Sequence, residues 1–281
     1  MWGNDVTPAA RSQIGHMSSD VIASQFAELK DLIVNKDDAR LATLLASGTN
    51  ANSSDVAGRT LLMAAAELGN ANAVKLLLSH GAKVNARDRL SYHDQGGSTA
   101  LHRAARYQHH EIVRLLITSK ADLNVCDKNG QTALHWAAEN GDLPMTQLLL
   151  DAGANPDRSC RTSTSLSTAV VLGHIDIVRL LLSKGAQLSH PANARTPVLQ
   201  YAVHIRKPDL CRLLIEAGAD VNATDYEGRT AWDKVKNGLT KMPDRLPGLS
   251  AEQIEDVRRT IDASNIIRSI LRNAGAEGST N

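Results

Sequence analysis

The sequence predicts an all-α fold in which short helix–turn–helix units stack into a solenoid, with β-turn fingers projecting between them. A Leu-Leu-x-x-x-Gly-Ala phrase or a close variant recurs along the chain, mostly every 32–33 residues, as at Gly48, Gly81, Gly153, Gly185 and Gly218. Repeats of about 20–50 residues are typical of solenoids, propellers and arrays. Hydrophobic residues make up 42% of the chain but aromatic residues only 3%, which favours closely packed helices over a sheet sandwich.

Residues 130–154 illustrate how one unit forms two antiparallel helices. The apolar residues of its first segment recur at helical spacing, as Leu134, Ala137 and Ala138. Gly141 then permits a left-handed turn, and Pro144 stands in a first helical turn, where proline is tolerated. A second apolar stripe follows and ends at Gly153; it comprises Met145, Leu148 and Leu149. Neither helix can bury its stripe alone, so we expect the units to be stabilised by their neighbours.

Five interior units are predicted between two atypical ends. The interior units cover residues 58–96, 97–129, 130–161, 162–194 and 195–227. An N-terminal capping helix pair is expected over 19–57, and an atypical C-terminal unit over 228–277 with a linker inserted at 238–250. Residues 1–18 and the tail 278–281 are expected to be disordered.

The C-terminal unit is predicted to end in a longer helix. Ser250 followed by Gln253 matches a capping box, which would open this helix. Its expected buried residues are Ile254, Val257, Ile261, Ile266, Ile267 and Leu271.

A second phrase keeps the same period, reading GRTLLMAAAELG from Gly58, GSTALHRAARYQ from Gly97 and GQTALHWAAENG from Gly130. With both phrases the chain resembles the ankyrin repeat family, over about residues 20–277. The resemblance implies that the first helices and the fingers line one concave side, where the family generally binds other proteins. It therefore implies a non-catalytic scaffold, adaptor or inhibitor.

Charge and cysteine content narrow the possible partners and location. The 31 basic and 30 acidic residues leave a net charge of +1, so we expect neither nucleic acid nor membrane as a partner. The first twenty residues lack the apolar core of a secretory signal, and no apolar run approaches a membrane span. Cys126, Cys160 and Cys211 do not suggest a disulfide framework, which favours an intracellular protein, cytoplasmic or nuclear. We also expect a monomer.

No motif in the sequence predicts a catalytic residue, a metal site or a cofactor. His102 and His135 recur at the repeat spacing, too far apart to share a zinc ion. The resemblance implies instead that each bonds to the preceding threonine and to a neighbouring loop. Cys126 and Cys160 fall in consecutive fingers, roughly one unit apart, which predicts no disulfide between them. Cys211 is expected to be a small core residue. An enzyme or enzyme subunit with a site assembled across units remains the alternative, followed by a nucleic-acid binder.

The resemblance places the candidate partner-binding residues in the first helices and the fingers. They are Tyr92, His93, Arg103, Arg106, Tyr107, Lys128, Asn129, Trp136, Glu139, Asn140, Arg158, Arg161 and Tyr226. Trp, Tyr and Arg are the residues most often responsible for binding energy at interfaces. Trp136 could equally pack on the next unit, and the lengthened finger at 89–97 could be a tolerated surface insertion.

The unit that carries this finger is irregular in its turns. Gln108 and Lys120 replace glycines that other units place at the two turn positions. We therefore predict left-handed backbone at both residues, at a cost of about 1 kcal/mol each.

Overall fold

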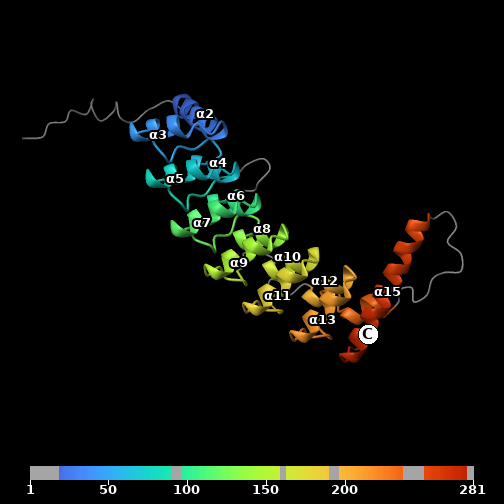
Figure 1. The fold of residues 1–281 in the computed structure, drawn as a ribbon. Helices are drawn as coiled ribbons and strands as arrows, with labels where there is room; N and C mark the ends of the chain where they lie inside the picture. Colours follow the sequence, from blue (N-terminus) through green and yellow to red (C-terminus); the bar gives the residue numbers. More distant parts are fainter. Residues whose placement is uncertain (1–18, 90–95, 159–162, 190–195, 237–249, 277–281) are drawn as a thin grey trace, which may run out of the picture. The chain divides into compact units, whose positions relative to one another are not determined.

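The computed structural model describes residues 19–89, 96–158, 163–189, 196–236 and 250–276. In these ranges every extended regular element is a helix, and the one β-bridge joins Ser54 to Thr60 (Figure 1). The prediction of an all-α chain of helix pairs is confirmed. The chain divides into two compact units, residues 1–128 (unit 1) and 129–281 (unit 2).

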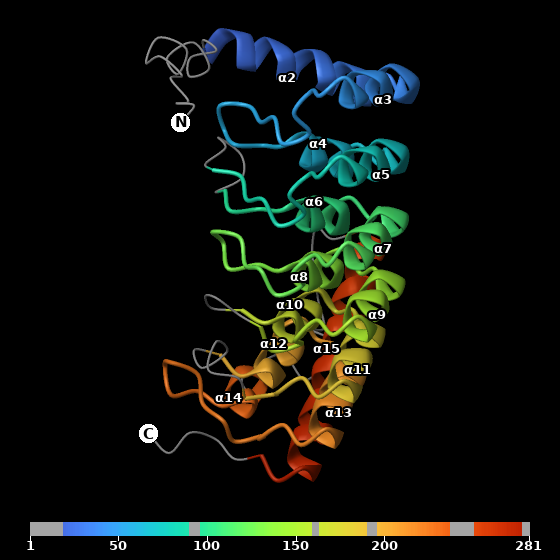
Figure 2. The same ribbon diagram turned by 90° about the vertical axis from the view of Figure 1, so that its left-hand side faces the viewer.

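Unit 1 contains three helix pairs. They are α2 (Ser19–Val34) with α3 (Asp38–Ala46), α4 (Leu61–Glu67) with α5 (Ala71–Ser79), and α6 (Ala100–Arg106) with α7 (His110–Thr118). The first helix of each pair packs on the first helix of the next, and the second helices do the same. Figure 2 shows the connecting turns projecting on the side of the first helices.

Unit 2 repeats this arrangement and ends differently. Its pairs are α8 (Ala133–Glu139) with α9 (Leu143–Asp151), α10 (Ser165–Leu172) with α11 (Ile175–Ser183), and α12 (Val198–His204) with α13 (Pro208–Glu216). The short helix α14 (Ala231–Lys236) packs on α12, and the long helix α15 (Ala251–Asn273) packs on both α13 and α14. Most of the predicted linker at 238–250 lies outside the described residues.

The first helices α4, α6, α8 and α10 begin at a threonine N-cap. In α6, α8 and α10 the side chain of the third helical residue also bonds back to the threonine. In α6 the Nδ1 atom of His102 accepts from the Thr99 N–H at 3.1 Å, and its Nε2 atom donates to the Val125 carbonyl at 3.0 Å. His135 makes the same contact to Thr132 at 3.2 Å and bonds the Ser163 carbonyl at 3.2 Å. Each histidine thus caps its helix and holds a following finger, which confirms the predicted structural role.

Helix α12 departs from this pattern because its N-cap residue is Pro197. Gln200 occupies the histidine position, and its Nε2 atom donates to the carbonyls of Ala223 and Arg229 at 3.0 and 2.8 Å. The finger contact of the histidines is therefore preserved. However, proline has no N–H to offer, and the buried Oε1 atom of Gln200 has no hydrogen-bond partner among the described residues.

Left-handed backbone occurs where the turn positions predict it. Gln108 and Lys120 have φ angles of 60° and 63°, as expected from the glycines that they replace. Lys36 and Arg206 adopt the same conformation at 56° and 54°, which the sequence analysis did not anticipate.

The buried residues follow the predicted stripes in part. Of the stripe predicted for α9, Met145 and Leu149 are fully buried, but Leu148 is only half-buried. Leu134, Ala137 and Ala138 are at most 1% exposed. Cys211 is fully buried as expected, and burial raises the pKa of its thiol to about 12. The capping box at Ser250 is present, and three of the six apolar residues predicted for α15 are buried, Ile261, Ile267 and Leu271.

Ile266 was predicted to be buried, but it is 41% exposed. Its neighbour Ile267 is fully buried. Consecutive helical residues point about 100° apart, so both cannot face the same neighbour. Ile254 and Val257, nearer the start of the helix, are only half-buried.

The state of Cys126 differs from the prediction that Cys126 and Cys160 form no disulfide. Cys126 is disulfide-bonded, whereas Cys211 is a free thiol. The predicted absence of a disulfide is therefore wrong for Cys126, and Cys160 lies outside the described residues. Because disulfides are rare in reducing compartments, the cysteines no longer favour an intracellular location.

Candidate binding surface

The first helices of unit 2 form a shallow groove, which we call the first-helix groove. It has a volume of about 260 Å³ and runs over α8, α10 and α12. Its lining residues are Glu139, Ser163, Ser167, Thr168, Val171, Leu172 and Tyr201. Helix α10 packs on both α8 and α12, so the three helices that carry the groove are held side by side by their own contacts.

Apolar side chains are exposed in this groove because of the pattern of α10. Leu166, Ala169 and Val170 recur at i, i+3 and i+4 and are fully buried. Val171 and Leu172 continue the apolar run beyond that stripe and are 43% and 48% exposed. Isolated exposed apolar residues are normal, whereas two adjacent ones within a groove indicate a place where another molecule can pack.

Two further residues border the groove on the neighbouring helices. Glu139, at the end of α8, is exposed, and its carboxylate accepts from the Gln131 side chain at 3.2 Å. Tyr201 is half-buried on α12. The sequence analysis missed Tyr201, although it stands one residue after the histidine-equivalent position, as Trp136 does in α8.

The other candidate residues of unit 2 are spread over its surface. Trp136, Asn129 and Asn140 are half-buried, and Arg158 is exposed. Tyr226 is 73% exposed at the tip of a finger, where a hydrogen bond with Glu227 raises the pKa of its hydroxyl. Among these, none lines the first-helix groove. Tyr92, His93 and Arg161 lie outside the described residues.

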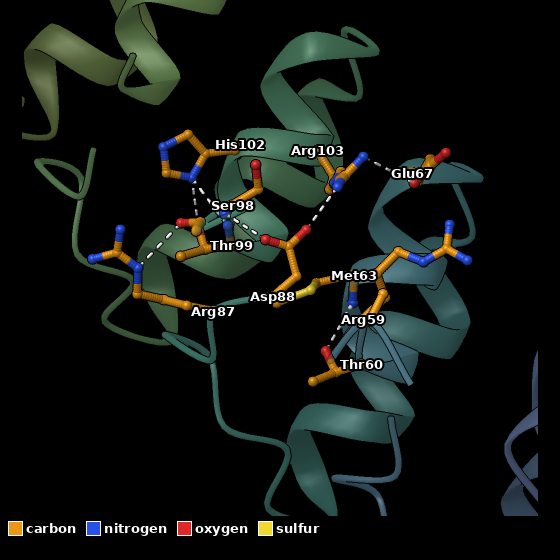
Figure 3. A network of polar contacts seen from close by, with 12 residues as sticks. Arg59, Thr60, Met63, Glu67, Arg87, Asp88, Ser98, Thr99, His102 and Arg103 are labelled. Carbon is orange, nitrogen blue, oxygen red and sulfur yellow. Dashed lines mark hydrogen bonds and ion pairs between the residues drawn. The ribbon is translucent and has the colours of Figure 1, made fainter. Parts of the chain in front are cut away.

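Arg103 was predicted to lie on the accessible surface, and this is wrong. Its side chain is 6% exposed, and its Nη2 atom donates to the Oδ2 atom of Asp88 at 2.8 Å (Figure 3). Its Nη1 atom lies 3.6 Å from the Glu67 carboxylate. Asp88 is itself fully buried at the side chain, and its Oδ1 atom accepts from the Ser98 N–H at 2.7 Å. Arg103 thus ties a finger to a first helix inside unit 1.

The remaining candidates of unit 1 are accessible. Tyr107 is 44% exposed at the end of α6, and its ring stacks with that of His109 at a centroid distance of 6.4 Å. The Arg106 guanidinium lies 5.8 Å from the Tyr107 ring centroid, within the range of a cation–π contact. Lys128 is exposed. Tyr107 is therefore held by its neighbours while part of its surface faces solvent.

The described ranges contain neither a membrane-spanning helix nor a cluster of metal-ligating side chains. No helix there is long and apolar enough to cross a membrane. Within the same ranges, no group of three or more His, Cys, Asp or Glu side chains is arranged to hold a metal ion.

Known proteins resemble this chain over most of its length. A family model described as "Ankyrin repeats (3 copies)" matches residues 31–127 and 116–192, and a single "Ankyrin repeat" model matches 193–226. The putative ankyrin repeat protein YahD of Escherichia coli is 31% identical over 175 residues, which cover 59% of this chain and 83% of YahD. The crystal structure of the human ASB11 ankyrin repeat domain superposes with a TM-score of 0.63 at 24% identity, covering 82% of this chain and 96% of that one.

Other relatives are much longer than the matching region. The B-cell lymphoma 3 protein homolog of Mus musculus is 33% identical over 184 residues, which cover 63% of this chain and 40% of the relative. A homolog of transient receptor potential cation channel subfamily A member 1 from Caenorhabditis elegans is also 33% identical, but the match covers 13% of it. This chain therefore corresponds to only a part of such relatives.

Proposed function

The chain belongs to the ankyrin repeat family, and from this premise we propose that it binds a partner protein through the first-helix groove of unit 2. Ankyrin repeats are generally protein–protein interaction modules and typically non-enzymatic. We accordingly propose a non-catalytic role as a scaffold, adaptor or inhibitor.

The observation that carries this proposal is the pair of exposed apolar side chains in the groove. Val171 and Leu172 are nearly half exposed, and a partner that covers them removes apolar surface from water. The groove holds about 260 Å³, which suits one or two side chains of a partner segment. We propose that an apolar side chain of the partner packs on Leu172 and that a basic residue beside it pairs with Glu139.

Substitution of Leu172 with glutamate tests this proposal. Full burial of a leucine is worth about 1.5–3 kcal/mol. Leu172 is already about half-buried, so covering the rest is worth roughly half of that, and the buried charge of the glutamate adds to the loss. We therefore expect partner binding to weaken about tenfold. Leu143→Glu is the matched control, because Leu143 is 38% exposed on α9, outside the groove. Affinity capture with the full chain, quantified by mass spectrometry, compares the two variants. If the Leu172→Glu and Leu143→Glu variants captured the partner equally well, the groove would not be the binding site.

Unit 1 offers a second contact surface around Tyr107. A half-exposed tyrosine held by a stacked ring and a guanidinium loses little entropy when it is covered, which is why such residues often dominate binding energy. Tyr107→Ala in the same capture experiment tests this surface separately from the groove. Unchanged capture would exclude Tyr107 from the interface.

A further inference from the structure

A second, larger cavity in unit 2 has no role in the proposed interface. It has a volume of about 520 Å³ and lies between the end of α12, helix α14 and helix α15. Its lining residues are Val203, His204, Arg206, Arg229, Asp233, Lys234, Val235, Ser264 and Arg268. Four of them are permanent cations and one is a carboxylate, an imbalance that the chain as a whole, at +1, does not share.

The carboxylates beside this cavity form ion pairs and hydrogen bonds with its basic residues. Asp225 bonds Arg229 and Lys234 at 3.2 and 3.1 Å. Burial opposes the ionisation of Asp225, but hydrogen bonds from the Arg229 N–H, Lys234 and the Glu227 N–H outweigh it and lower its pKa to about 2. Glu227 pairs with Arg229 at 2.6 Å. These contacts hold Arg229 and Lys234 in place at the rim of the cavity.

Asp233, the one carboxylate of the lining, is turned toward its own helix. Its Oδ2 atom accepts from the Thr230 N–H and hydroxyl at 2.9 and 3.0 Å, which caps α14. Its Oδ1 atom pairs with Lys236 at 2.6 Å. Its side chain is only 5% exposed, and its pair with Lys236 offsets its negative charge beside the cavity.

Two arginines complete the cationic lining, Arg206 from the turn after α12 and Arg268 from α15. The guanidinium of Arg268 is oriented by bonds from Nε to the Val235 carbonyl at 2.7 Å and from Nη1 to the Asn265 side chain at 2.8 Å. Arg206 is exposed and occupies the turn position that glycine fills at Gly173, with φ at 54°. A non-glycine residue held in left-handed backbone costs stability, and such strain concentrates at functional sites.

We propose that this cavity binds the dianionic phosphate group of a phosphate monoester. The charged residues of the lining and their ion-pair partners together carry a net charge of +2. They are the five cations Arg206, Arg229, Lys234, Lys236 and Arg268 and the three carboxylates Asp225, Glu227 and Asp233. This net charge matches the charge of a phosphate monoester near neutral pH. Guanidinium groups bind phosphate oxygens through two parallel hydrogen bonds. They bind a carboxylate in the same way, but a ligand of one charge would leave part of the net charge of the site unmatched. The site is separate from the first-helix groove, so either can fail without the other.

Isothermal titration of the full chain at constant ionic strength tests the site with three probes. The probes are inorganic phosphate, a phosphoserine peptide and the same peptide with serine. Phosphate and the phosphopeptide are expected to bind saturably, and the serine peptide is not. Tighter binding of the phosphopeptide supports a phosphorylated protein as the source, and equal affinity supports a small phosphate ester.

Arg206→Gly separates binding from folding. It removes one cation and relieves the left-handed strain, so we expect phosphate affinity to fall about fivefold while the melting temperature stays equal or rises. Lys234→Gln is expected to weaken binding as well. Arg212→Gln removes the same charge from the exposed Arg212–Asp209 pair on α13 and is expected to leave binding unchanged. Absence of saturable phosphate binding, or an equal loss in Arg212→Gln, would overturn the proposal.

Discussion

Replacement of Asp88 with asparagine is expected to destabilise the protein through a single buried ion pair. The substituted side chain would keep its size and could still accept from the Ser98 N–H. Its amide N–H groups, however, would face the Arg103 guanidinium, where the Oδ2 atom of Asp88 now accepts at 2.8 Å. A donor would then meet a donor in a site where both side chains are at most 6% exposed.

The structure sets the size of the effect. Removal of one partner from a buried ion pair costs about 3–5 kcal/mol, mainly because the other charge stays buried. Glu67 lies 3.6 Å from the same guanidinium and is one-third exposed, so it compensates part of the lost charge. We therefore expect a loss near the lower end, about 3 kcal/mol.

Urea unfolding followed by circular dichroism measures this loss, provided that the m-value is unchanged. Asp209→Asn is the matched control, because its pair with Arg212 is exposed and is expected to contribute less than about 1 kcal/mol. Arg103→Met is expected to cost about as much as Asp88→Asn, and the double variant less than the sum of the two. If Asp88→Asn were as mild as Asp209→Asn, the contact between Asp88 and Arg103 would not stabilise unit 1 as we infer.

Two other substitutions test the turns and caps by unfolding free energy. In Gly69→Ala the added Cβ would lie 2.7 Å from the His109 ring at a φ of 73°, so we expect a loss of about 2–3 kcal/mol. Gly48→Ala, at a φ of 95° with no atom within 4 Å, is expected to lose only about 1 kcal/mol, and equal losses would contradict a steric role for His109. Pro197→Thr restores an N–H and a hydroxyl at the N-cap of α12, so we expect the free energy of unfolding to rise by about 1 kcal/mol. Pro197→Ala restores the N–H alone and is the control. If the two variants gained the same stability, the hydroxyl would contribute nothing.

Features set by local chemistry were predictable from the sequence. The helix pairs follow from apolar residues at helical spacing and from the turn residues between them. The left-handed conformation of Gln108 and Lys120 followed from comparison with the glycines of other units. The roles of His102 and His135 followed in the same way, since each bonds a threonine three residues before it. These contacts are short in sequence and repeat from unit to unit.

The candidate surface was predicted less well. Arg103 was assigned to it because its position varies between repeats. The Arg103 side chain is buried instead, because it pairs with Asp88, fifteen residues earlier in the finger. Tyr201 was overlooked, although the same alignment of units that identified Trp136 contains it. A variable position can serve either a partner or a neighbouring finger, and the sequence of one chain does not distinguish the two.

The sequence by itself determined the period, the helix pairs and most of the caps, because each depends on residues within one unit. The tertiary structure alone decided which variable side chains reach solvent and which become buried, because those outcomes depend on how neighbouring helix pairs and fingers pack. It also brought Arg206, from the turn after α12, to one cavity with Lys234 of α14 and Arg268 of α15. The spacing of those three residues in the sequence does not predict the cavity, because it forms only where α14 packs on α12 and α15 packs on α14.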